Sequence, residues 1–232
     1  MLVQFWDDTK TIPADVRECM KSWQPLREQG FDYLLFDDGS ARQFIAKHFG
    51  HRHIAAFERC RHPAMRCDYF RLCYISEKGG FYVDADDVYQ GGPYEFWFDD
   101  DRLKLQSLCY NVTSDSMVEK IDFIVDSSDS SDLIFYVNNN PLIAPPNHPV
   151  LRTALERSTK ILLNHKGYTR SVQSTTGPGN LTASLVHNAI ESERKSKARN
   201  FVFLADWHTV SVSQWPLEYR SDERNWRLWA NH

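Results

Sequence analysis

The chain has 232 residues, of which 42% are hydrophobic and 13% aromatic, so it can fold around a sizeable core. Its formal net charge of −4 excludes general binding to nucleic acid, which requires clustered Lys and Arg. No run approaches the roughly 20 apolar residues of a membrane span, and no basic leader precedes Asp7. We therefore expect a cytoplasmic protein without a membrane span.

Strand and helix signals alternate over residues 1–90. We expect a strand at 2–5, a helix at 13–23, a strand at 32–36, a helix capped by Ser40 and ending near 48, helices at 54–59 and 63–77, and a strand at 81–83. This alternation predicts an α/β domain with a central, mostly parallel sheet flanked by helices.

The second half is less regular. We expect strands at 103–110, 123–125, 133–137 and 201–205, helices at 149–163 and 180–192, and an exposed polar loop at 126–132. No internal repeat or linker interrupts the chain, so residues 1–232 are predicted to form a single domain. The five cysteines are odd in number and lack C-x-x-C spacing, which favours buried free thiols over a disulfide framework.

The segment Phe81-Tyr-Val-Asp-Ala-Asp-Asp87 carries the strongest functional signal. An apolar strand runs directly into three carboxylates, which repel one another unless positive charge lies among them. A hard divalent cation, Mn²⁺ or Mg²⁺, is the usual solution and commonly also binds substrate phosphates. Period-two geometry places Tyr82, Asp84 and Asp86 on one face at the carboxyl end of the strand, where α/β sheets bind ligands.

The preceding helix adds to this signal. Asp68 and Arg71 are three residues apart and share a helix face, from which they can hold sugar hydroxyls by charged hydrogen bonds. Gly79 suits a left-handed helix cap, and Gly80 lets the chain turn at once into the strand. A second D-x-D, Asp99 to Asp101, lacks this context and is interpreted as a solvated turn.

The same residues allow a rival function. An apolar strand followed by Asp84-x-Asp86 also resembles the opening of haloacid-dehalogenase-like Mg²⁺-dependent phosphatases. Those enzymes need a later acidic motif of Gly-Asp type, and this chain contains no Gly-Asp dipeptide. The phosphatase is therefore the alternative rather than the preferred hypothesis.

The wider pattern resembles the sugar-binding D-x-D region of glycosyltransferase family 32 and, more distantly, the glucosylating domains of large bacterial toxins. The resemblance rests on four ordered blocks: Val3-Gln-Phe-Trp6 with Ile12-Pro13; Asp68-x-x-Arg71 followed by Gly79-Gly-x-Tyr-x-Asp-x-Asp86; Asn138-Asn-Asn140 with Pro146-Asn-His-Pro149; and Thr175-Thr-Gly-Pro-Gly179. It implies a GT-A fold and a transferase that retains anomeric configuration.

The resemblance also implies roles for individual residues. Trp6 would stack on the nucleotide base, Asp68 and Arg71 would bind the donor sugar, and Tyr82 and Asp84 would bind ribose and sugar. Asp86 would hold the metal, with Asp84 beside it. Further candidates are Asn139 or Asn140 for the sugar, His208 or Asn225 for the metal, and the amides of the Thr-Gly-Pro loop for a phosphate.

Two functional hypotheses follow from these assignments. The first is a metal-dependent hexosyltransferase that moves a sugar from a UDP- or GDP-sugar to a glycan or another hydroxyl acceptor, as in polysaccharide biosynthesis. The second is a non-catalytic protein that binds sugar nucleotides. The set formed by Asp68, Arg71, Asp84 and Asp86 favours the enzyme.

Overall fold

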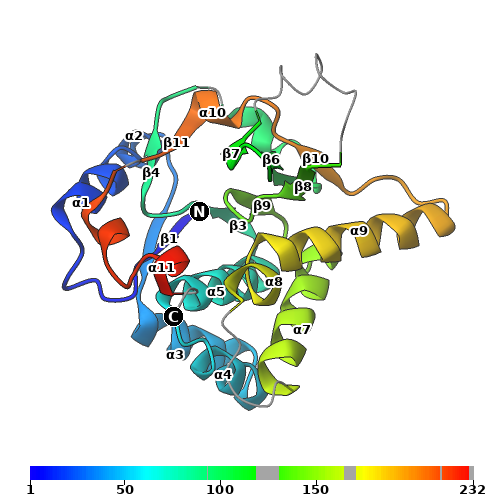
Figure 1. Cartoon of the computed structure of the whole chain (residues 1–232), viewed down its shortest axis with the longest axis horizontal. Helices are drawn as coiled ribbons and strands as arrows, with labels where there is room; N and C mark the ends of the chain where they lie inside the picture. The colour runs from blue at the N-terminus through cyan, green and yellow to red at the C-terminus, as the bar shows by residue number, and fades with distance from the viewer. Residues whose placement is uncertain (93, 119–130, 165–170, 215, 230–232) are drawn as a thin grey trace.

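The computed structural model describes residues 1–92, 94–118, 131–164, 171–214 and 216–229. A six-stranded sheet with the order β10-β5-β9-β3-β1-β2 lies at its centre (Figure 1). Its strands are β1 (Leu2–Phe5), β2 (Tyr33–Phe36), β3 (Gly80–Tyr82), β5 (Leu103–Leu105), β9 (Leu142–Ala144) and β10 (Phe201–Phe203). β1 pairs in parallel with β2 and β3, β5 pairs in parallel with β10, and β9 runs antiparallel to both β3 and β5.

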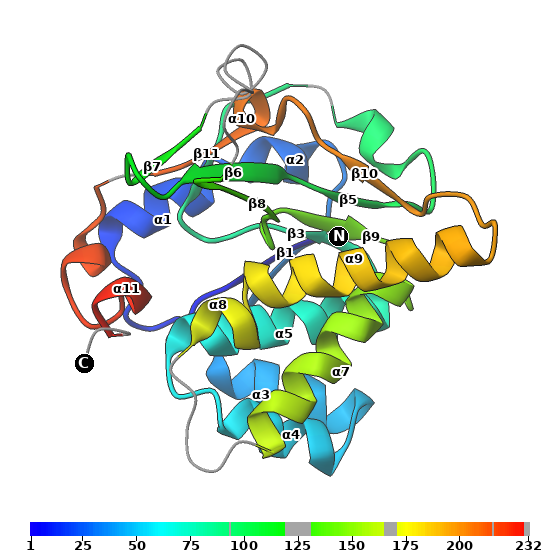
Figure 2. The same cartoon turned by 45° about the vertical axis from the view of Figure 1, so that its right-hand side comes forward.

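Helices lie on both faces of this sheet, as Figure 2 shows. The helices are α1 (Ala14–Lys21), α2 (Gln24–Glu28), α3 (Asp38–His48), α4 (His51–Glu58), α5 (Pro63–Lys78), α7 (Pro149–Asn164), α8 (Val172–Thr175), α9 (Pro178–Arg194), α10 (Trp207–Val210) and α11 (Trp226–Trp229), with 3-10 turns η1 (Glu95–Phe98) and η2 (Glu218–Ser221). Helices α3, α4, α5 and α7 lie on one side of the sheet, and α1 and α2 lie toward the other. None of the helices among these described residues has the length and apolar character needed to cross a bilayer.

Alternation along the strands divides the core into two layers. Val3 and Tyr82 point into the cluster with α3, α5 and α7, whereas Leu2 and Phe81 point into a second cluster built around Trp23. Both pairs are fully buried, and β1 and β3 are in register with Leu2 opposite Phe81. The alternation fixes which side chains after Tyr82 turn toward α5.

Two small sheets complete the fold. β4 (Asp87–Tyr89) pairs antiparallel with β11 (Ser211–Ser213), which brings the segment after residue 206 to the acidic cluster. β6 (Ser107–Asn111) pairs with β7 (Ser116–Met117) and β8 (Leu133–Val137) in a three-stranded antiparallel sheet. Both pairings join segments that are far apart in the chain.

A tight turn joins α5 to β3. Gly79 has φ +66° and ψ −166°, so its φ is positive as predicted, although ψ differs from that of a left-handed helix. A Cβ at Gly79 would lie 2.8 Å from the Pro146 ring and 2.9 Å from the Ala144 carbonyl oxygen. The close approach of this backbone to β9 therefore requires glycine.

The predicted α/β class is confirmed, with three corrections. Asp37, not Ser40, caps α3, because its carboxylate accepts from the Ser40 amide at 2.8 Å while the Ser40 hydroxyl accepts from the Asp37 amide. The strand expected at 103–110 is two strands, β5 and β6, which belong to different sheets. Helix α9 begins at Pro178 and not at residue 180, since proline fits the first helical turn. α2 was not predicted. The strand expected at 123–125 and most of the loop at 126–132 lie outside the described residues.

Candidate functional site

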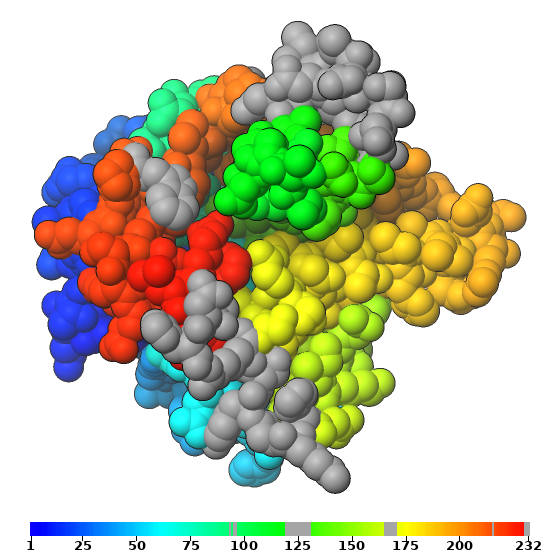
Figure 3. All heavy atoms as spheres, in the orientation of Figure 1, coloured from blue at the N-terminus to red at the C-terminus, as the bar shows by residue number. Residues whose placement is uncertain are grey.

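A cavity of about 540 Å³ opens at the carboxyl ends of β1 and β3. Its volume lies within the range of roughly 300–1,000 Å³ that small-molecule sites occupy. Its walls come from the residues that follow β1 and β3, from helix α5, from β6, β7 and β8 with the Asn138–Asn140 segment, from the starts of α8 and α9, and from the segment after residue 206. In Figure 3 that last segment, coloured orange to red, lies beside the blue N-terminal region and the yellow residues of α8 and α9.

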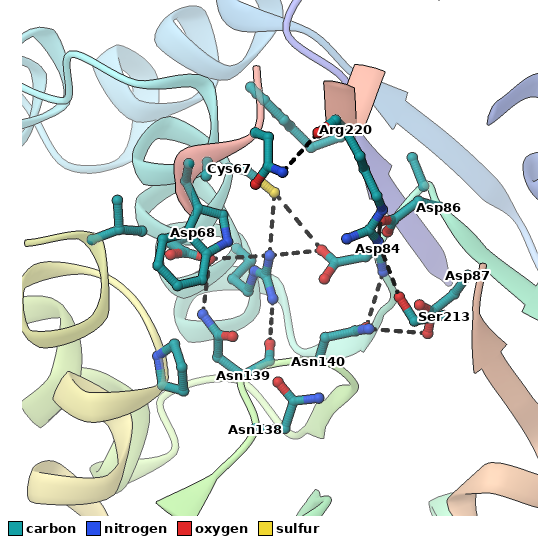
Figure 4. Close-up of a pocket in the computed structure, with 18 of the residues that line it drawn as sticks. Cys67, Asp68, Asp84, Asp86, Asp87, Asn138, Asn139, Asn140, Ser213 and Arg220 are labelled. Atoms are coloured by element: carbon teal, nitrogen blue, oxygen red, sulfur yellow. Dashed lines mark hydrogen bonds and ion pairs between the residues drawn. The ribbon is translucent and has the colours of Figure 1, made fainter. Parts of the chain in front are cut away.

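Arg71 lies at the centre of the polar network, and Figure 4 labels three of its partners, Asp68, Asp84 and Asn139. Its Nη2 lies 2.7 Å from Asp84 Oδ1 and 3.1 Å from Asp68 Oδ1, and its guanidinium stacks 4.4 Å from the centroid of the Tyr82 ring. Nη1 donates to the Asn139 carbonyl. Only 3% of the Arg71 side chain is exposed, so one guanidinium holds two carboxylates and a backbone carbonyl in fixed positions.

Burial and the charge of Arg71 have opposite effects on the two carboxylates of this network. Burial raises the pKa of Asp68 to about 6, and the nearby Arg71 guanidinium opposes that rise. Burial also raises the pKa of Asp84, again opposed by Arg71. Burial disfavours the charged form of Arg71, but Asp84 and its other neighbours raise its pKa well above the usual value. The guanidinium therefore stays charged between two carboxylates.

Asn139 and Thr176 complete the surroundings of Asp68. Asn139 Nδ2 donates to Asp68 Oδ1 at 2.8 Å, and the Thr176 hydroxyl donates to Asp68 Oδ2 at 3.3 Å. Gly177 packs against the same carboxylate, because a Cβ there would lie 3.3 Å from Asp68 Oδ2. The Thr-Gly-Pro loop thus borders Asp68.

Asp86 points to a different partner. Its Oδ2 accepts from the Tyr219 hydroxyl at 2.6 Å and from Arg220 Nη2, and Arg220 Nη2 also donates to the Ser213 hydroxyl at 3.3 Å. The Asp86 side chain is 13% exposed. Asp86 is therefore bound by Tyr219 and Arg220, which lie close to the end of the chain. Neither residue belongs to a motif that the sequence analysis identified.

Asp87 turns away from Arg71 and is buried. Its Oδ2 accepts from Asn140 Nδ2 at 3.0 Å and from the Ser211 hydroxyl at 3.1 Å. Burial, followed by the charges of Asp86 and Asp84, raises the pKa of Asp87 to about 8. Asn140 Oδ1 also accepts from the Asp84 amide, so this one amide side chain fixes the shape of the whole acidic turn.

Two supporting residues were not assigned roles from the sequence. Gln4 is fully buried in β1, donates to the Asp84 carbonyl at 3.1 Å and accepts from the Tyr33 hydroxyl at 2.8 Å. Cys67 lies 3.2 Å from Arg71 Nη2, and burial raises the pKa of its thiol to about 12. All five cysteines are free thiols, as predicted. A buried polar residue inside an apolar strand is the signal that marks Gln4.

The remaining predicted residues surround the same cavity. Trp6 lines it and packs edge-on against Tyr219 at 5.3 Å between ring centroids. His208 also lines it, with an exposed side chain in the first turn of α10. Asn225 uses its amide to bind backbone instead, since its Nδ2 donates to the Arg220 carbonyl at 2.7 Å and its Oδ1 accepts from the Arg227 amide.

The donor atoms of this wall fit a hard cation that shares its ligands with a substrate. Among the described residues, no group of three His, Cys, Asp or Glu side chains forms a ready-made metal cage. Asp84 Oδ2 and Asp86 Oδ1 nevertheless accept none of the hydrogen bonds made by described side chains, and the Ser213 hydroxyl is near. One or two carboxylates completed by substrate phosphates are the usual protein ligands of Mg²⁺.

Comparison with known proteins agrees with this geometry. Residues 13–104, which contain Asp68, Arg71, Asp84 and Asp86, match the family described as "Glycosyltransferase sugar-binding region containing DXD motif". A solved structure titled "PaToxG Glycosyltransferase" is similar, with a TM-score of 0.54 and 14% identity over 84% of this chain and 70% of that chain. No curated protein sequence matches significantly. Asp99 to Asp101, also inside the matched range, forms an exposed bend as predicted.

The fold, the matched region and the polar site together define a glycosyltransferase of the GT-A type. The match favours this class over the phosphatase alternative, since the acidic strand end lies within the matched sugar-binding region. The chain is thus an enzyme of the glycosyltransferase class.

Proposed function

We propose that this glycosyltransferase transfers a hexose from a nucleoside-diphosphate sugar to a hydroxyl group with retention of configuration, and that it depends on Mn²⁺ or Mg²⁺. We further propose that residues 1–232 act as one catalytic domain. Strands from residue 2 to residue 203 share the central sheet, which supports this view. UDP- and GDP-sugars are the donor classes, and a glycan is the expected acceptor.

The observation that carries the proposal is the buried position of Arg71 between Asp68 and Asp84. A guanidinium held by two carboxylates is a rigid set of charged donors and acceptors at the cavity wall. Such a set suits the hydroxyl groups of a sugar, which both donate and accept hydrogen bonds. We assign Asp68, Arg71 and Asn139 to the donor sugar, and Tyr82 and Asp84 to the positioning of ribose and sugar.

The nucleotide and the cation are assigned to the part of the cavity around Asp86. We assign Trp6 to the base, because its ring lines the cavity and packs against Tyr219, whose hydroxyl binds Asp86. We assign Asp86, with Asp84 and Ser213, to the metal, which would stabilise the charge of the leaving diphosphate. His208 remains a candidate further ligand. The contacts of Asn225 and Asn140 favour roles in positioning the chain over direct ligation.

The environment of the carboxylates favours attack by the acceptor on the same face that the diphosphate leaves. Asp68 and Asp84 both bind Arg71, and Asp86 binds Arg220. A carboxylate that is neutralised by a guanidinium is a poor nucleophile, so a covalent sugar–enzyme intermediate is disfavoured. Arg71 and its two carboxylates would instead orient the sugar while positive charge develops at its anomeric carbon.

A donor panel tests the proposal. UDP-glucose, UDP-galactose, UDP-N-acetylglucosamine and GDP-mannose are titrated by calorimetry in Mn²⁺, and release of free sugar is then measured for each. We expect one donor to bind more tightly than the others and to be hydrolysed slowly. Binding of a donor without any turnover, even with candidate acceptors present, would favour the non-catalytic sugar-nucleotide-binding hypothesis.

A further inference from the structure

Arg220 occupies the position beside Asp86 that a metal ion requires. It lies in η2 (Glu218–Ser221), and its side chain is only 11% exposed. Its Nη2 donates to Asp86 Oδ2 and to the Ser213 hydroxyl, the latter at 3.3 Å. Figure 4 shows the Arg220 side chain extending toward Asp86 and Ser213.

The segment that carries Arg220 is attached to the site at further points. The Tyr219 hydroxyl donates to the same Asp86 oxygen at 2.6 Å, and the Tyr219 ring packs against Trp6. Asn225 Nδ2 donates to the Arg220 carbonyl at 2.7 Å. Movement of the guanidinium away from Asp86 therefore affects Tyr219 and Asn225 and, through Tyr219, the position of Trp6.

A divalent cation and a guanidinium compete for this carboxylate. Both are positive, and both would approach the oxygens of Asp86 within a partly closed cavity, where like charges repel strongly. Coordination through Asp86 is thus opposed while Arg220 keeps its place. Once released, a guanidinium matches a diphosphate well, because its planar fork donates two parallel hydrogen bonds to phosphate oxygens.

We infer that the Arg220 guanidinium neutralises Asp86 in the free enzyme. When metal and donor bind, the side chain moves away from Asp86 and its guanidinium binds the donor diphosphate. This inference rests on the proposed function and assigns a second, diphosphate-binding state to a residue that no sequence motif marks. The exchange couples arrival of the donor to the position of η2. The ligand class recognised by the released guanidinium is a nucleoside diphosphate.

The test separates the two states of Arg220 by measuring binding rather than turnover. Mn²⁺ alone is titrated into the wild-type protein, Arg220→Gln, Arg220→Lys and Asp86→Asn, and free Mn²⁺ is followed by electron paramagnetic resonance. UDP binding is then measured by calorimetry at saturating Mn²⁺. Arg194→Gln, at the far end of α9 and paired with Glu191, is the matched control for loss of one positive charge.

We expect Arg220→Gln to bind Mn²⁺ alone about tenfold more tightly than wild type, equivalent to about 1.4 kcal/mol, and to bind UDP more weakly. Arg220→Lys should have Mn²⁺ and UDP affinities between those of wild type and Arg220→Gln, because lysine keeps the positive charge but lacks the planar guanidinium group. Arg194→Gln should match wild type in both titrations. Circular dichroism and thermal unfolding check that each variant is folded.

Unchanged Mn²⁺ affinity in folded Arg220→Gln and Arg220→Lys, with binding abolished by Asp86→Asn, overturns the inference about Arg220 and leaves the proposed metal site standing. If Arg220→Gln binds Mn²⁺ more tightly but binds UDP with the affinity of wild type, the proposed movement of the guanidinium to the diphosphate is also overturned. Absence of Mn²⁺ and UDP binding in every variant, wild type included, instead overturns the proposed function on which the inference rests.

Discussion

Arg71 Nη2 lies 2.7 Å from Asp84 Oδ1, and this contact joins the middle of α5 to the end of β3 across thirteen residues of chain. The Gly79 turn makes it possible by sending the chain straight from the helix into the adjoining strand. The same guanidinium reaches Asp68 one helical turn earlier. The Asp68–Arg71–Asp84 network, to which we assign the donor sugar, is thus built within a single helix–strand unit.

Removal of Arg71 tests how much the fold depends on this unit. We expect Arg71→Ala to lower the free energy of unfolding by about 3 kcal/mol, because two buried carboxylates lose their counter-ion. Urea denaturation at neutral pH measures the change. Arg102→Ala removes an exposed Arg–Asp100 pair and should lower stability far less than Arg71→Ala does. Equal midpoints for both variants would contradict the structural role of Arg71.

Asp68 predicts a distinct pH dependence. Its folded-state pKa of about 6 exceeds the value of 3.8 expected when unfolded, so its contribution to stability is fully present below pH 3.8 and is lost as pH rises through 6. Asp68→Asn should therefore gain stability relative to wild type between about pH 4 and pH 6, while its affinity for donor falls. Denaturation curves across this range provide the measurement.

Asp100 is the control for the Asp68 experiment, because its pKa is lowered and the pH dependence of its contribution to stability has the opposite sign. Hydrogen bonds from Arg102, and then from Lys104, lower the pKa of Asp100, so its contribution is present at neutral pH and is lost on acidification. Asp100→Asn should be less stable than wild type at neutral pH, and the difference should shrink in acid. Parallel curves for Asp68→Asn and wild type from pH 4 to 7 would refute the assignment for Asp68.

The Gly79 turn can be tested by separating backbone strain from steric overlap. Gly50 also has a positive φ of 76°, but a Cβ there would meet nothing within 4 Å, whereas at Gly79 it would overlap Pro146 and Ala144. Gly50→Ala should lose only the cost of backbone strain, about 1 kcal/mol. Gly79→Ala should lose about 2 kcal/mol more. Thermal unfolding of both variants decides between these values, and equal losses would argue against the tight approach to β9.

The local part of this architecture was predictable from sequence. Asp68 and Arg71 share a helix face by spacing alone, and Asp84 follows the strand that the helix feeds, so their meeting needs no distant information. The α/β class followed from the alternation of elements in the same way. The Asp37–Ser40 capping box was misassigned because either residue can occupy the cap.

The distant part was not predictable. Arg220 and Asp86 are separated by 134 residues, and Gln4 and Asp84 by 80, so nothing in the local pattern of either residue indicates its partner. The pairing of β4 with β11 is what brings Ser213 and the following segment to the acidic turn. Only the assembled fold shows that Asp86 has a guanidinium beside it.

The most direct test of the account compares the two D-x-D copies in one assay. Metal-dependent hydrolysis of the best donor is measured for wild type, Asp86→Asn and Asp101→Asn, the last in the exposed second copy, each with Mn²⁺ and with excess chelator. We predict that Asp86→Asn loses activity by about 100-fold or more, that Asp101→Asn matches wild type, and that chelator abolishes activity in both active proteins. Full activity of folded Asp86→Asn, or of wild type in chelator, would contradict the proposal that Asp86 holds a catalytic cation.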